Sequence, residues 1–139
     1  MNLLPFLLNE SLVAEEIAQF DWPVPYELED DMPDGINVCF PRSNFFFMEG
    51  LEGRISVGFL KGDTKIKDMN LTIQDALEVL APEVNTRATY DFFDIPGEKS
   101  EEKVRAGIKR CLGFIHEHLQ GVVQGDFSWA PEARRRRRM

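Results

Sequence analysis

The chain has 139 residues, of which 43% are hydrophobic and eleven are phenylalanine, so it can fold as one domain around a real core without low-complexity disorder. Its formal net charge is −8, although five of its 16 basic residues form the single run Arg134 to Arg138. Removing those five leaves 11 basic residues against 24 acidic ones, a net charge of −13. Such an acidic body disfavours nucleic acid and anionic lipid and favours a cationic partner.

The cysteines and the first residues indicate a cytoplasmic protein. Cys39 and Cys111 are too few and too far apart for the disulfide framework of a small secreted domain, so we expect two reduced, mostly buried thiols. A single disulfide or a redox role is the alternative. Residues 1–9 are apolar but lack the basic residues of a secretory signal. No apolar run approaches the roughly 20 residues of a membrane-spanning helix, so we expect no membrane association.

A first helix is predicted over residues 3–20. Apolar residues recur at helical spacing in this range, Asn2 is available as the N-cap, and Pro5 lies in the first turn, where a missing N–H costs little. Pro23 and Pro25 then impose extended backbone and end the helix.

Strand character dominates the next forty residues. A short strand is predicted at 26–29, and residues 36–40 alternate between apolar and polar side chains. Residues 45–49 and 54–60 flank a four-residue loop, 50–53, which is typical of a hairpin. With a further ambiguous segment at 89–95, these runs predict an antiparallel meander of three to five strands.

Two more helices follow the strands. Thr72 is a good N-cap for the first, which ends at Pro82. Ser100 caps the longest helix, predicted over residues 101–124, whose apolar residues form one stripe. Gly107 and Gly113 each cost this helix about 1 kcal/mol relative to alanine, which suggests close packing against a sheet or a neighbouring helix.

These elements predict an α+β fold in which the N-terminal helix and the long C-terminal helix pack on one face of an antiparallel sheet. Residues 1–130 would form this single domain and residues 131–139 a basic C-terminal tail. The expected core residues are Leu8, Leu12, Ile17, Phe40, Val57, Phe59, Leu77, Leu80, Ile108, Leu112 and Ile115.

The last twenty residues combine aromatic and basic side chains. Phe127 and Trp129 are expected to fold back onto the core as a clasp, with an exposed aromatic anchor as the alternative. The run Arg134 to Arg138 is expected to be a short, largely solvated tail. Binding to RNA or to an anionic surface, and folding against its own domain or a neighbouring copy, remain open for it.

No catalytic, cofactor-binding or metal-binding residues are predicted. His116 and His118 lie two residues apart, so they cannot share one metal ion from the same helix, and we expect one exposed and one half-buried structural histidine. Cys111 shares a helix face with His118, but a zinc site would need two further ligands. The sequence therefore predicts no metal and no organic cofactor.

Motifs for calcium binding, nucleophilic catalysis and phosphate binding also lack the required spacing. The acidic run that begins at Asp30 has Met32 and Pro41 where a calcium-binding EF-hand loop needs an oxygen ligand and a glutamate. Neither a nucleophile elbow nor a phosphate-binding glycine loop occurs. These absences favour a binding protein over an enzyme.

A resemblance to a known family narrows the range of binding functions further. A small acidic domain with an N-terminal helix, a Phe-rich antiparallel meander at 36–40, 45–48 and 54–60, and a long terminal helix closing on 125–129 resembles the bacterial immunity proteins of polymorphic-toxin systems. The resemblance implies a stoichiometric inhibitor that occludes a cognate toxin, often a basic nuclease, without chemistry of its own.

Two alternatives stay open. The chain could be an interaction or adaptor subunit that uses the same acidic surface for another partner. It could also be a small enzyme whose site is built from scattered side chains such as Tyr90, Asp91, Asp94 and His118.

The partner-binding surface is expected where carboxylates and aromatic side chains occur together, because charge steers association and an aromatic side chain anchors it. Two segments meet this condition. The predicted partner-binding residues are Tyr26, Glu27, Glu29, Asp30, Asp31, Asp34, Tyr90, Asp91 and Asp94. The expected partner is a basic protein, such as a toxin.

Overall fold

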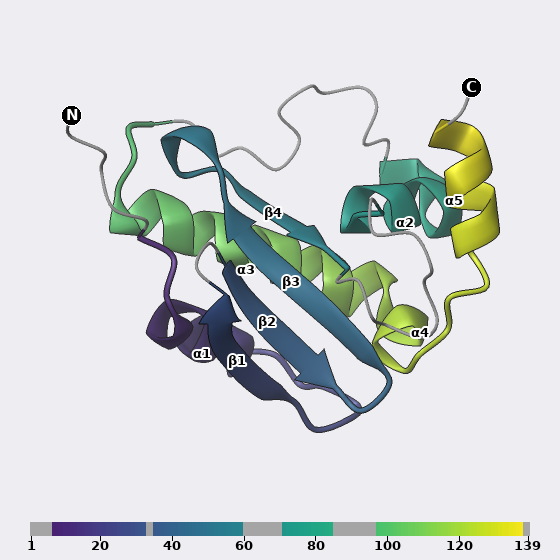
Figure 1. Cartoon of the computed structure of the whole chain (residues 1–139), viewed down its shortest axis with the longest axis horizontal. Coiled ribbons are helices and arrows are strands. Elements are labelled where there is room, and N and C mark those ends of the chain that lie inside the picture. The colour runs from purple at the N-terminus through teal and green to yellow at the C-terminus, as the bar shows by residue number, and fades with distance from the viewer. Residues whose placement is uncertain (1–6, 33–34, 60–70, 85–96, 138–139) are drawn as a thin grey trace.

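Four antiparallel strands form the centre of the fold, shown in Figure 1. The structure is a computed structural model that describes residues 7–32, 35–59, 71–84 and 97–137. The strands are β1 (Glu27–Met32), β2 (Gly35–Phe40), β3 (Ser43–Glu49) and β4 (Ile55–Gly58). They follow one another in the order β1-β2-β3-β4, so the predicted meander is confirmed. The predicted segment 89–95 lies outside the described residues.

The sheet has one face covered by helices, which we call the inner face. Its side chains alternate along the strands and are buried: Ile36, Val38, Phe40, Phe45, Phe47, Ile55 and Val57. Helix α3 (Glu101–His118) runs behind this face in Figure 1, and helix α1 (Glu10–Ile17) lies beside it. Together they make the predicted α+β architecture, with the N-terminal and the long C-terminal helix packed on one face.

Helix α1 begins later than predicted. Asn9, not Asn2, is its N-cap, and the Asn9 Oδ1 accepts a hydrogen bond from the Leu12 N–H at 3.0 Å. Leu7 and Leu8 precede the helix because their N–H groups donate to the Glu49 Oε1, each at 2.7 Å. Leu8 is half-buried rather than a core residue. The predicted cap Asn2 lies outside the described residues.

Helix α2 (Ile73–Leu80) has the predicted cap. Thr72 and Asp75 form a capping box, in which the Asp75 N–H donates to the Thr72 hydroxyl and the Asp75 carboxylate accepts from the Thr72 N–H. The prediction that Leu80 is a core residue is wrong, since its side chain is 45% exposed. Burial in this helix ends with Leu77, and Leu80 lies in the last turn beyond it.

The long helix is shorter than predicted. Ser100 caps α3 as expected, but the helix ends at His118, and Leu119 leaves the helical conformation with its side chain buried. A separate turn, α4 (Gln120–Val123), follows. The predicted range 101–124 therefore contains two helices.

The C-terminal clasp is confirmed, whereas the solvated tail is not. Phe127 and Trp129 are buried, and their ring centroids lie 5.7 and 5.6 Å from that of Phe59. Beyond them, helix α5 (Ala130–Arg137) packs against α2, and the Arg136 Nη1 donates to the Glu78 carbonyl oxygen at 2.8 Å. The described part of the arginine run is therefore helical, and Arg136 folds against its own domain.

Glycine in α3 has two different roles. A Cβ built at Gly107 would lie 2.9 Å from the Cγ1 and 3.1 Å from the Cβ of Ile55, so the predicted close packing holds here. A Cβ at Gly113 would meet nothing within 4 Å, and the same prediction is wrong there. Gly107 is thus the position at which α3 approaches the sheet.

These two glycines provide a matched pair of variants. Gly107→Ala is expected to destabilise the protein by about 1–3 kcal/mol, because the added methyl overpacks the contact with Ile55. Gly113→Ala is expected to stabilise it by up to about 1 kcal/mol through helix propensity alone. Urea denaturation of both variants measures the difference. Equal effects would mean that α3 does not approach β4 at Gly107.

A buried carboxylate joins three distant segments. Glu49, at the end of β3, is 5% exposed and accepts from the N–H groups of Leu7 and Leu8. Its Oε2 lies 2.7 Å from the Lys99 Nζ, just before α3. The pair is largely removed from water, so its loss costs more than that of a surface ion pair.

Glu49→Gln is expected to lower the free energy of unfolding by about 1–3 kcal/mol, because the amide keeps an acceptor for the two N–H groups but no longer balances the Lys99 charge. Glu83→Gln, at an exposed position, is the control and should change stability by less than about 0.5 kcal/mol. Chemical denaturation of both variants measures their free energies of unfolding. Equal stabilities would show that Glu49 contributes no more than a surface carboxylate.

Candidate functional site

The described residues include part of the predicted partner-binding set. Tyr26, Glu27, Glu29 and Asp30 are described, and Asp31 lies in β1 by its backbone. The other four, Asp34, Tyr90, Asp91 and Asp94, lie outside the described residues. Three members of the set carry exposed carboxylates, and we call them together the acidic edge: Glu27, Glu29 and Asp30.

The acidic edge follows from the position of β1. This strand lies at one edge of the sheet, and it pairs with β2 in the register Glu27↔Cys39 and Glu29↔Asn37. Glu27 and Glu29 are two residues apart, so their side chains lie on the same face of the strand. That face, opposite the helices, is the outer face of the sheet.

Asn37 positions one carboxylate of the acidic edge. Its side chain is 3% exposed, and its Nδ2 lies 3.4 Å from the Glu29 Oε2 and 3.3 Å from the Cys39 Sγ. Its Oδ1 is buried and has no hydrogen-bond partner among the described residues. Such an unsatisfied buried acceptor is uncommon and carries a desolvation cost.

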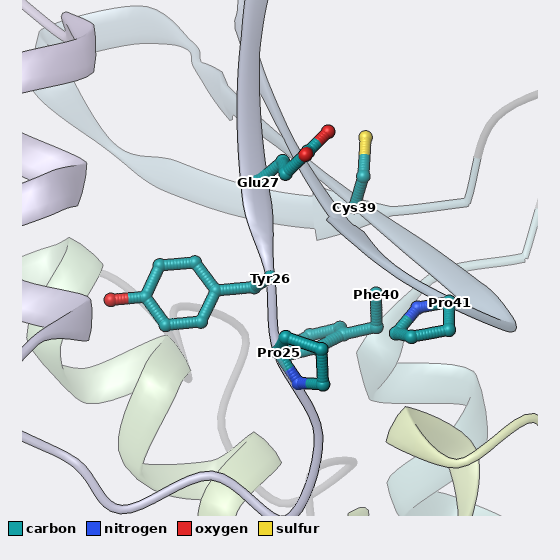
Figure 2. A pocket seen from close by; sticks show the side chains of 6 residues that line it. All are labelled: Pro25, Tyr26, Glu27, Cys39, Phe40 and Pro41. Carbon is teal, nitrogen blue, oxygen red and sulfur yellow. The ribbon is translucent and has the colours of Figure 1, made fainter.

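The Tyr26 side chain points away from the acidic edge. Figure 2 shows its ring on the side opposite to Glu27 and Cys39, and its centroid lies 6.2 Å from that of Phe40 in an edge-on arrangement. It is half-buried and packs against the core. Tyr26 therefore contributes to the inner face, and the aromatic ring that accompanies the acidic edge does not project outward.

A hollow lies where β1 and β2 meet at their ends. Its volume is about 210 Å³, and it is lined by Pro25, Tyr26, Glu27, Cys39, Phe40 and Pro41. Figure 2 shows the Glu27 carboxylate and the Cys39 thiol side by side, with the two proline rings next to each other. We call this hollow the proline pocket. It is smaller than the roughly 300–1,000 Å³ of pockets for drug-sized ligands, so it suits a single side chain.

A second hollow lies on the other side of Pro41. Its volume is about 280 Å³, and it is lined by Val24, Pro41, Arg42, Val123 and Gln124. The positive charge of Arg42 here contrasts with the carboxylate of the proline pocket. The two hollows extend the concave surface from the start of β1 to the end of α4.

Pro25, Cys39 and Pro41 were not predicted as site residues. The alternation in 36–40 placed Cys39 on the polar side of its strand, but only the pairing Glu27↔Cys39 brings it beside a carboxylate. The two prolines flank the hairpin of β1 and β2, Pro25 before β1 and Pro41 after β2, so their proximity depends on the same register.

Both histidines have structural roles. The His116 Nε2 lies 2.9 Å from the Asp21 carbonyl oxygen, and its ring packs against Phe20 and Trp22, with centroids 5.3 Å away in each case. His118 stacks on Phe114. Both are half-buried, so the prediction that one is exposed is wrong.

Within the described ranges, no three or more His, Cys, Asp or Glu side chains gather in a way that could hold a metal ion. The helices of the same ranges include none that is long and apolar enough to span a bilayer.

No family model, no curated protein and no solved structure matches this chain.

The two thiols provide a chemical test of the site. Cys39 is half-buried at the proline pocket, whereas Cys111 is fully buried, and burial raises the pKa of its thiol to about 12. Because the thiolate is the reactive form, an aromatic disulfide reagent should titrate one thiol per native chain and a second only after unfolding. Cys39→Ser should abolish the native reaction. Two thiols reacting at the same rate in the native protein would contradict this placement.

Proposed function

We propose that this domain is an acidic protein-binding module that acts as an immunity-type stoichiometric inhibitor of a basic partner. The observation that carries the proposal is the acidic edge: three exposed carboxylates on the outermost strand, next to a pocket of side-chain size. Charge at such a rim accelerates encounter with a cationic surface, and a pocket receives an anchoring side chain.

The distribution of charge supports this direction of binding. Helix α5 carries the arginine run and lies at the opposite end of the molecule from β1 in Figure 1. Arg135 and Arg136 pair with Glu132 on the same helix, and this pairing lowers the pKa of the Glu132 carboxyl to about 2. Arg135 and Arg136 are thus engaged with their own helix, and Arg136 also with α2, while the acidic edge stays exposed.

The immunity-type assignment draws on the resemblance in size, charge and organisation described above. An adaptor subunit would use the same surface, so the two functions differ in the partner rather than in the site. If the partner is a toxin, its expression should arrest growth and co-expression of this chain should restore it. The product of the gene immediately upstream is the first candidate to test in this way.

The charge contribution is tested by association kinetics with that partner. The double variant Glu27→Lys/Asp30→Lys is expected to slow association about tenfold or more at low salt, because steering of charged partners accelerates encounter by about 10–10³-fold. For the unchanged protein the on-rate should fall steeply as salt rises, since screening acts beyond about 10 Å at 0.1 M. Stopped-flow or surface-based kinetics at two salt concentrations measure both effects.

The matched control is Glu102→Lys/Glu117→Lys, which makes the same change in net charge on exposed positions of α3, away from the acidic edge. It should alter the on-rate much less. Both double variants should keep their thermal stability within about 0.5 kcal/mol, as solvated substitutions usually do. Equal slowing by the two variants would retire the acidic edge as the binding surface.

A further inference from the structure

We propose that the partner adds an extended basic segment to the free edge of β1, as a fifth strand, and places one apolar side chain in the proline pocket. This inference rests on the proposed function and specifies its binding mode. It requires a strand edge that can pair, cations that match the carboxylates, and an occupant for the pocket.

The free edge is the first requirement. β1 pairs with β2 on one side, and no described residue pairs with its other side. An edge strand turns alternate N–H and C=O groups outward, and these can pair with another chain. Two copies of β1 placed side by side would oppose glutamate to glutamate, which is unfavourable. The edge therefore disfavours self-association and favours a basic strand.

The spacing of the carboxylates is the second requirement. Glu27 and Glu29 lie on one face of β1, about 6.8 Å apart along the strand. Lysine or arginine at every second position of an added strand would repeat at the same interval and face both carboxylates. The Asn37 Nδ2 donates to the Glu29 Oε2 and so holds this carboxylate in place on the outer face.

The pocket fixes where the added strand begins. Pro25 precedes the edge strand and has no N–H to donate, so regular backbone pairing of β1 ends here. The proline pocket lies at this point, lined by two proline rings, Phe40 and the Cys39 thiol. Its largely apolar lining and small volume suit one leucine-sized side chain at the end of the paired segment.

Cys39 reports on occupancy of the pocket, so the test does not require the natural partner. The probe is a capped seven-residue peptide with leucine at its first position, lysine at every second position after it and valine in between, so that the leucine and the lysines share one face of the strand. The control peptide has the same side chains and charge, but alternate backbone amides are N-methylated, which removes donors needed for strand pairing. The full-length protein is alkylated with iodoacetamide with and without each peptide.

At about four times its Kd, the probe is expected to slow alkylation of Cys39 about fivefold, because the fraction of open sites falls by 1 + [L]/Kd. At the same concentration the N-methylated peptide should leave the rate nearly unchanged. Hydrogen exchange of the β1 amides should slow only with the probe. Glu27→Gln/Glu29→Gln should weaken binding of the probe, whereas Glu102→Gln/Glu117→Gln should not.

Equal protection by the two peptides would overturn strand addition, since charge alone would then explain binding. Failure of the probe to protect Cys39 at millimolar concentration would overturn it as well. Neither outcome affects the proposed function, which fails instead if charge reversal at the acidic edge leaves the partner's on-rate unchanged.

Discussion

The seating of α3 on β4 is the contact on which the rest of the structure depends. At Gly107 the helix backbone comes so close to Ile55 that no Cβ fits, and one turn further on the Cys111 Sγ lies 4.0 Å from the Ile55 carbonyl oxygen. Helix α1 is held in turn to α3, where Arg105 reaches Glu15 at 2.7 Å and Glu16 at 3.0 Å. Both helices thereby cover the inner face of the sheet and leave the outer side of β1 without a helix.

Local signals in the sequence were sufficient for much of this architecture. The caps Thr72 and Ser100 act on N–H groups three residues away, so they were found correctly. The start of α1 was missed because Glu49, more than forty residues later, takes the N–H groups of Leu7 and Leu8. Helix α5 was missed for a similar reason, since its docking depends on the contact between Arg136 and the Glu78 carbonyl. Interactions between distant segments leave no local pattern to read.

In the candidate site too, some features follow from local sequence and others from the pairing of strands. The exposure of Glu27 and Glu29 follows from alternation in a strand that contains Leu28, and it could be predicted from three neighbouring residues. The proline pocket could not, because it exists only in the register that sets Glu27 opposite Cys39. A shift of one residue would turn Cys39 toward the helices and Phe40 outward. Burial of Val38 and Phe40 on the inner face excludes that shift, so the hydrophobic core itself fixes the pocket.

The position of the arginine run determines whether it competes with a cationic partner for the acidic edge. A basic tail attached to an acidic body is attracted to it, and a tail free to reach β1 would compete with any cationic partner at high effective concentration. Helix α5 removes this competition by binding elsewhere. Ala130 and Ala133 are buried, Arg136 donates to the last turn of α2, and Glu132 balances part of the charge within the helix. The fold that docks helix α5 against α2 therefore also keeps Arg136 away from the exposed carboxylates of Glu27, Glu29 and Asp30.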